Sequence, residues 1–256
     1  MKEEFANKDG LVIEDGILIG CSGDKDEVII PEGVECIFER AFFRKGHIKR
    51  IEIPDTVREI GDLAFYAASG LKELKLPMAL SIIGENAFAS LNLREISVPN
   101  GVRVIKKETF AYNHALKKLT LNDGLIEIGE GAFRVSDALT TVELPKSVRK
   151  IGNYAFSSCS ALTSLTLNDG LEYIGKNAFS EAKSLGSLVI PSTVKVIDTF
   201  AFRDCKRLTA LTIEDGVENI GYGAFSGCDM LRKVVIPQSV KNIEQSAFPN
   251  CKIIRK

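Results

Sequence analysis

The sequence predicts a solenoid of short parallel strands, in which about ten copies of one repeat stack into a single rod. The clearest observation is the spacing of phenylalanine, since ten of the fourteen recur at steps of 23 residues, with one step of 22. Periods of this length are typical of repeat proteins, whose units bury their apolar faces only against neighbouring units. The ten residues are Phe42, Phe65, Phe88, Phe110, Phe133, Phe156, Phe179, Phe202, Phe225 and Phe248.

Each repeat carries a short strand about nine to eleven residues after its phenylalanine. Val142 and Leu144 flank Glu143 there, and this in-out-in alternation indicates a half-buried strand. A corner follows, and from Phe110 onward it alternates between proline and Asp-Gly, where glycine is expected to supply an unusual φ. We therefore expect about ten parallel strands, roughly 4.8 Å apart, on a concave face. The corner prolines are Pro54, Pro77, Pro99, Pro145, Pro191 and Pro237.

The remainder of each repeat predicts a short second strand and a one-turn helix. An isoleucine such as Ile151 precedes a glycine such as Gly152 in most repeats, and the pair marks a second corner. Ala-Phe follows so soon that only one helical or 3₁₀ turn fits before the next repeat. The phenylalanines should then stack as one buried column.

We expect a single domain over residues 1–256, with a cap at 1–27, repeats at 28–248 and a C-terminal end at 249–256. Apolar runs at 11–13 and 17–19 flank Glu14-Asp15-Gly16, which predicts a β-hairpin covering a first strand at 28–30. No comparable cap follows Phe248. The last strand edge should therefore be exposed and support weak self-association, unless Arg255 and Lys256 blunt it.

Composition excludes several classes of function. The net charge is −1, from 33 basic and 34 acidic residues, whereas nucleic-acid binders usually show a basic excess. Only two histidines are present, and no nucleophile elbow, P-loop or GxGxxG motif occurs, so we expect no enzyme activity, cofactor or metal. No segment resembles a signal peptide or a membrane span, which on sequence alone indicates a cytoplasmic chain without membrane insertion.

Four of the six cysteines occupy one position of the repeat, three residues after phenylalanine. Alanine or serine stands there in other repeats, so the position reads as a small buried slot holding reduced thiols. The alternative is a disulfide between stacked neighbours among Cys205, Cys228 and Cys251, because adjacent coils bring Cα atoms within reach.

The outward residues of six successive strands form the candidate partner-binding site, here called the outward stripe. They are rich in hydroxyl groups and poor in charge, and charge depletion marks the centre of protein interfaces. The alternative is that threonine and valine merely favour an exposed strand. The stripe comprises Lys118, Thr120, Thr141, Glu143, Ser164, Thr166, Ser187, Val189, Ala210, Thr212, Lys233 and Val235.

The repeat L-x-x-L-x-I-P-x-x-V-x-x-I-G-x-x-A-F-x-x-C resembles that of the BspA-like leucine-rich-repeat family of bacterial and protist proteins. Residues 142–159, VELPKSVRKIGNYAFSSC, show it well, and the DGILIG hairpin is similar to that family's opening segment. The resemblance covers about residues 9–254. It implies a solenoid with a cell-surface or secreted context, although this chain carries no export signal. Unlike commoner leucine-rich repeats, it has no asparagine ladder after the strand.

These observations predict a non-enzymatic module that binds another protein. The resemblance implies adhesion or recognition through the concave face of the solenoid. The absence of an export signal keeps open an intracellular scaffold or regulatory partner-binding protein.

Overall fold

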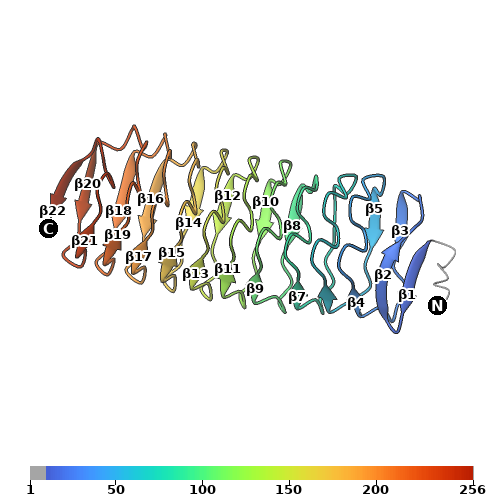
Figure 1. Cartoon of the computed structure of the whole chain (residues 1–256). Coiled ribbons are helices and arrows are strands. Elements are labelled where there is room, and N and C mark those ends of the chain that lie inside the picture. The colour runs from blue at the N-terminus through green and yellow to red at the C-terminus, as the bar shows by residue number, and fades with distance from the viewer. Residues whose placement is uncertain (1–9, 256) are drawn as a thin grey trace.

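Residues 10–255 are described by the computed structural model and form an elongated rod of stacked coils, with the chain termini at opposite ends (Figure 1). Each coil has three sides. Strands of mostly three or four residues make the long-strand face, strands of two residues make the short-strand face, and the stacked phenylalanines lie along the third side. The predicted repeat solenoid is confirmed.

The long-strand face is divided into five parallel pairs of strands and is not one sheet. The pairs are β3–β5, β8–β10, β12–β14, β16–β18 and β20–β22. No strand forms at 73–75, where the repeat predicts one. The strands are β3 (Glu27–Ile29), β5 (Arg50–Glu52), β8 (Glu95–Ser97), β10 (Lys118–Thr120), β12 (Thr141–Glu143), β14 (Ser164–Thr166), β16 (Ser187–Ile190), β18 (Ala210–Ile213), β20 (Lys233–Ile236) and β22 (Lys252–Arg255).

Proline contributes to the division into pairs. Within the pair β16–β18, the Glu214 N–H donates to the Ile190 carbonyl oxygen at 3.0 Å, just past the end of the strands. One repeat later the same position is Pro237, which has no N–H to donate back to the preceding coil. Pro145 and Pro191 likewise follow β12 and β16, so each gap from β10 onward lies before a coil with a proline corner. The pair β3–β5 forms although Pro54 follows β5, so a missing donor alone does not break a pair.

The short-strand face is more continuous. It contains β4 (Cys36–Ile37), β6 (Glu59–Ile60), β7 (Ile82–Ile83), β9 (Val104–Ile105), β11 (Glu127–Ile128), β13 (Lys150–Ile151), β15 (Tyr173–Ile174), β17 (Val196–Ile197), β19 (Asn219–Ile220) and β21 (Asn242–Ile243). Strands β9 to β21 make one seven-stranded sheet, and the only break lies between β7 and β9. The corner glycines permit close coil contact, since a Cβ on Gly152 would lie 2.7 Å from the Gly129 carbonyl carbon.

On the third side, ten phenylalanine rings stack in one column, with neighbouring ring centroids 4.9 to 5.4 Å apart. The expected one-turn helices do not form within residues 10–255. Tyr154 and Ser158, two residues before and after Phe156, have left-handed φ values of 57° and 62°, and a right-handed helix cannot pass through such residues. Their N–H groups donate instead to the next coil, to Lys176 and Ser180 carbonyl oxygens, both at 2.8 Å.

The N-terminal hairpin forms as predicted, from β1 (Leu11–Glu14) and β2 (Ile17–Cys21). Its place differs from the expectation, because β2 pairs with β4 on the short-strand face and not with β3. Leu11 and Leu18 are buried, so the hairpin covers the end of the core.

The C-terminal end also differs from the expectation. Strand β22 pairs with β20 in parallel, and so protects the edge that was predicted to be exposed. Weak self-association, now through β22, stays a prediction. The charged side chains of β22, Lys252 and Arg255, are exposed and would oppose pairing with a second copy of the same edge.

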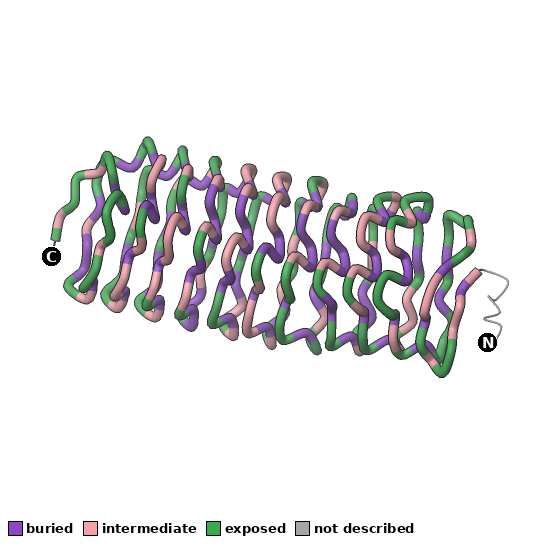
Figure 2. Tube along the Cα trace, viewed as in Figure 1, coloured by how far each residue is buried: buried purple, intermediate pink, exposed green. Residues whose placement is uncertain are grey.

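Apolar side chains fill the interior along the whole rod, as the buried segments of each coil in Figure 2 show. One continuous cluster runs from Leu11 to Phe248. A continuous core is consistent with the expected single domain, which stays a prediction.

Candidate interaction face

The outward stripe lies on the long-strand face, where the sequence predicts it. Eleven of its twelve side chains are exposed, and Val235 is partly buried. The neighbours within each pair are in register, with Thr141 beside Ser164 and Glu143 beside Thr166. The alternation therefore places hydroxyl groups and aliphatic atoms, such as the half-exposed Val189, at solvent.

The stripe is interrupted, although its stacking in register suggests an unbroken surface. It crosses the gaps between β10 and β12, between β14 and β16, and between β18 and β20. Two of these gaps are grooves, of about 330 Å³ beside Lys118 and Thr141, and about 640 Å³ beside Thr212 and Val235. A partner on this face would meet pairs of strands separated by shallow grooves.

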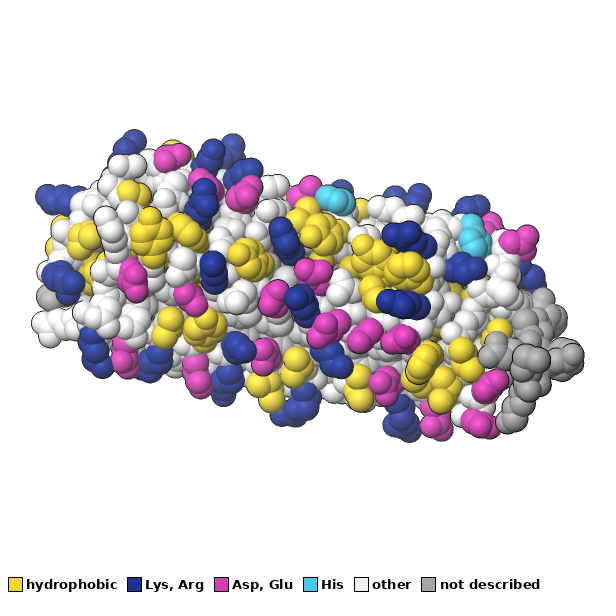
Figure 3. Space-filling model, viewed as in Figure 1, with side chains coloured by type: hydrophobic (Ala, Val, Ile, Leu, Met, Phe, Trp, Pro, Cys, Tyr) yellow, Lys and Arg dark blue, Asp and Glu magenta, His cyan; other side chains and the backbone are white. Residues whose placement is uncertain are grey.

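Charge on the stripe is sparse and unpaired. Lys118, Glu143 and Lys233 are its only charged members, and within the described chain none of them makes an ion pair. At the N-terminal end of the same face, by contrast, Arg50 pairs with Glu52 at 2.5 Å and Lys49 with Asp26 at 2.9 Å. Acidic and basic side chains are interspersed along the whole rod (Figure 3).

Three of the four cysteines that stand three residues after a phenylalanine are buried, as the small-residue position predicts, and Cys251 is partly buried. Cys159, Cys205 and Cys228 are buried free thiols, and each donates to the carbonyl oxygen of a phenylalanine in the preceding coil, at 3.3 to 3.6 Å. Burial raises the pKa of Cys159 to about 12. A hydrogen bond with Cys228, together with burial, also raises the pKa of Cys205. The thiols of Cys159 and Cys205 are therefore poor nucleophiles at neutral pH.

Within residues 10–255, no group of three or more His, Cys, Asp or Glu residues is placed so that it could hold a metal ion. His114 lies on the surface with Nδ1 3.3 Å from Asp137, and His47 is also exposed. None of the described segments forms an apolar helix of bilayer-spanning length.

The burial of three asparagines was not predicted from the sequence. Asn122 and Asn168 occupy the Asp-Gly corners, where each side-chain amide donates to two carbonyl oxygens of the preceding coil. Their Oδ1 atoms accept from the N–H of Gly124 and Gly170, so these glycines lie in side-chain-bonded turns and do not take the expected positive φ. Asn113 binds carbonyl oxygens beside the phenylalanine column. At the corners of Asn122 and Asn168, the sequence signal for this role was an asparagine at the position that proline occupies in other repeats.

Comparison with known proteins identifies the repeat. The family described as BspA type leucine rich repeat region, with six copies, matches residues 13–139 and 126–255. The chain belongs to the BspA-type leucine-rich-repeat family. The predicted resemblance is thereby confirmed. Leucine-rich-repeat proteins are protein-interaction modules, and this chain carries the repeat of that class.

Two solved structures are similar to this BspA-type chain. A leucine rich cell surface protein from Faecalibacterium prausnitzii is 24% identical, with 98% of this chain and 92% of that chain covered and a TM-score of 0.51. A leucine-rich repeat protein from Eubacterium ventriosum is 18% identical, with 93% and 78% covered and a TM-score of 0.54. At such identities the likeness shows the fold alone. No curated protein is significantly similar in sequence.

Proposed function

We propose that this protein is a non-enzymatic recognition or adhesion module that binds another protein through the outward stripe. The observation that supports this proposal is a long row of exposed side chains with few charges, which are in register within each pair of strands. Docking there would desolvate few ions, which otherwise costs several kcal/mol each. The hydroxyl groups both donate and accept hydrogen bonds, which suits a polar or backbone-rich target.

A cell-surface context is part of the proposal. It is supported by the family and by the similar fold of a protein described as a cell-surface protein. Fractionation of the native host, with the protein detected by antibody on intact cells, tests this part separately from binding. Detection only after lysis would contradict it and favour the intracellular scaffold.

The stripe is tested by mutation at its centre. Thr166→Arg and Thr212→Arg change exposed side chains, so the free energy of unfolding should change by no more than about 0.5 kcal/mol. Binding to a partner purified from the native host should weaken by about 2 kcal/mol or more, because a charge then stands at the interface centre. Gln245→Arg is the matched control, since Gln245 is exposed just past β21, away from the stripe.

Calorimetric titration gives the affinity for each variant. Affinity that survives both threonine substitutions, yet falls on substitution of Arg50 or Lys75, would move the contact to the N-terminal coils and end the stripe proposal.

A further inference from the structure

Residues 71–77, called here the third coil, are the irregular part of the long-strand face. They lie between β5 and β8, but no strand forms. Within the described structure, the N–H and carbonyl groups of residues 73–76 make no hydrogen bond. The one bond on this face from the third coil to the next is between Arg94 N–H and the Lys72 carbonyl oxygen, at 3.1 Å. Four consecutive peptide groups are thus left for solvent or a ligand.

Proline corners contribute to this isolation. Pro77 lacks the N–H that would donate back to the coil of β5, and Pro99 lacks the one that would donate back to the third coil. From Phe110 onward, proline corners alternate with Asp-Gly corners, and every coil there keeps a partner on one side. The coil of β5 also lies between two such prolines, Pro54 and Pro77, but it still pairs with β3, whereas the third coil has lost its strand.

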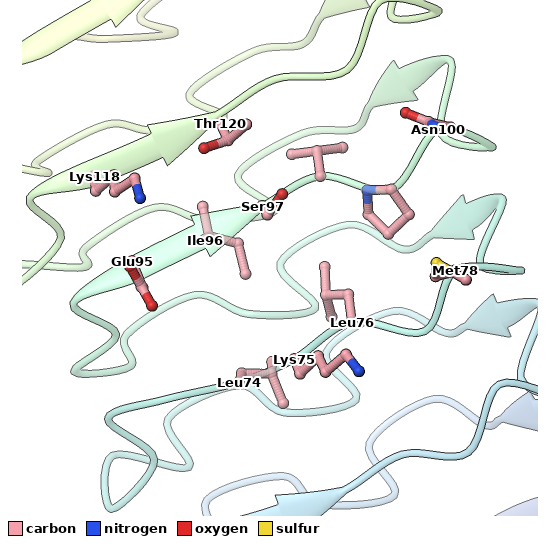
Figure 4. A pocket seen from close by; sticks show the side chains of 12 residues that line it. Leu74, Lys75, Leu76, Met78, Glu95, Ile96, Ser97, Asn100, Lys118 and Thr120 are labelled. Carbon is pink, nitrogen blue, oxygen red and sulfur yellow. The ribbon is translucent and has the colours of Figure 1, made fainter.

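Two grooves border the third coil. The one toward β8 has a volume of about 510 Å³, and the one toward β5 about 590 Å³. Figure 4 shows Leu74 and Leu76 on the third coil facing the groove that Ile96 of β8 borders, with Met78 at the corner. Met78 is 78% exposed, the largest value among the exposed large apolar side chains of the described residues. The floor of the groove is apolar, but Leu76 and Ile96 are buried core residues, so Met78 and the partly buried Leu74 supply most of its exposed apolar surface.

Unpaired basic residues surround this floor. Lys72, Lys75 and Lys118 line the two grooves, and Arg94 and Lys117 directly precede β8 and β10; none of these five described residues makes an ion pair. Among the unpaired lining residues, these three lysines stand against Glu73 and Glu95, whereas Arg94 and Lys117 lie outside the lining. Figure 3 shows apolar side chains gathered over this part of the rod, with basic and acidic ones beside them. The grooves thus carry a small basic excess in a chain of net charge −1.

We propose that the third coil and its grooves bind an extended segment of a partner protein that alternates apolar and acidic residues. The apolar side chains lie against Met78 and the partly buried Leu74, and the carboxylates face Lys75 and Lys118. The segment's backbone bonds to the peptide groups of residues 73–76, which is recognition by strand addition. This inference rests on the proposed function in that the protein is an interaction module, but its site lies apart from the centre of the stripe.

The test uses the full chain and a fluorescein-labelled peptide, acetyl-Glu-Val-Glu-Val-Glu-Val-Glu-amide. Binding is measured by fluorescence anisotropy, against the same peptide with lysine in place of glutamate and against one with proline as its central residue. The acidic peptide should bind, and the lysine and proline peptides should bind at least about tenfold more weakly, because one reverses the charges and the other breaks the extended pairing.

Charge variants locate the site. Lys75→Glu with Lys118→Glu should weaken binding of the acidic peptide at least about tenfold. Lys106→Glu with Lys176→Glu makes the same change in net charge at exposed residues beyond the short-strand face, and should leave binding within about twofold. Amide hydrogen exchange gives a second measurement, since residues 73–76 should exchange fast in the free protein and slow markedly with peptide bound.

The proposal is overturned if the acidic and basic peptides bind alike or not at all, or if exchange at residues 73–76 is unchanged by peptide. A protein dimer that Lys75→Glu abolishes would also overturn it, since a second copy would then fill the groove. Failure of this proposal is distinguishable from failure of the proposed function, because Thr166→Arg would still weaken binding of the native partner.

Discussion

The stacked phenylalanine column should carry a large share of the stability of the rod, and Phe156→Ala tests this. Phe156 is fully buried, with its ring stacked between Phe133 and Phe179 at centroid distances of 5.2 Å on both sides. Truncation removes on the order of 150 Å² of buried apolar surface, which at 25 cal/mol per Å² is about 4 kcal/mol. This lies within the usual range of about 3–5 kcal/mol for Phe→Ala in a core.

Two variants separate burial from ring stacking. Phe156→Leu keeps most of the apolar volume but loses both ring stacks, so it should cost about 1–3 kcal/mol. Phe38→Ala removes a ring that is half exposed and outside the column, and should cost less than about 1 kcal/mol.

Urea denaturation followed by circular dichroism measures these free energies, and thermal melting gives a second reading. A chain of this length loses about 2 °C of melting temperature per kcal/mol, so Phe156→Ala should melt about 6–10 °C lower. Equal losses for Phe156→Ala and Phe38→Ala would refute the view that the column stabilises the rod.

Four further predictions address thiols, asparagine, pH and cooperativity. Ellman's reagent should leave Cys159 unmodified in native protein at pH 8 and modify it on unfolding, because burial raises its pKa to about 12; rapid modification of the native thiol would contradict this. Asn168→Ala should lower the free energy of unfolding by about 2–3 kcal/mol, because it removes two hydrogen bonds and leaves the Val148 carbonyl oxygen unpaired, whereas the exposed Asn250→Ala should change little in the same denaturation assay. Burial and the hydrogen bond to Asp198 raise the pKa of Tyr173 to about 12, so its contribution to stability should be complete below the unfolded value near pH 10 and be lost as pH rises toward 12; absorbance at 295 nm should show Asp198→Asn lowering this pKa, and no change would argue against the hydrogen bond. Calorimetry should show one unfolding transition, since the core is continuous from Leu11 to Phe248, and two separated transitions would mean two independent units.

The sequence predicted the features that depend on which residues are apolar. The 23-residue recurrence of phenylalanine placed the buried column, and the alternation around residues such as Val142 placed the strands and their exposed residues. Leu11 and Leu18 likewise marked the hairpin. These features follow from burial, which leaves a periodic signature in a single sequence.

Features that depend on backbone conformation were not predicted. Ala-Phe read as a helical turn, because neither Tyr154 nor Ser158 signals the left-handed conformation that both adopt. In other coils the same two positions hold Gly131, Gly223 and Gly227, also at positive φ, and these glycines were a local hint. The buried role of Asn122 depends on a carbonyl oxygen contributed by the preceding coil, which no local pattern reveals.

Whether the candidate face is continuous could not be predicted from side-chain alternation, because it depends on N–H donors. Thr120 and Glu143 occupy equivalent outward positions in neighbouring repeats, yet they lie on either side of a gap. The proline corners were recognised as turns, but their consequence for the hydrogen bonds between coils appears only when the coils are stacked.

The alternation of corners makes the pair of coils, rather than the single repeat, the unit of the long-strand face. The short-strand face and the phenylalanine side keep hydrogen bonds from coil to coil through most of the rod, so spacing there is fixed. On the long-strand face, no backbone bond joins neighbouring pairs of strands before Pro145, Pro191 and Pro237, so these pairs are held together by side-chain packing and by bonds to side chains at the corners. One of these runs from the Gly216 N–H to Ser239 Oγ at 2.8 Å. Missing donors at Pro77 and Pro99 likewise border the third coil, whose peptide groups at 73–76 make no hydrogen bond, so proline contributes both to the segmentation of the face and to its free backbone groups.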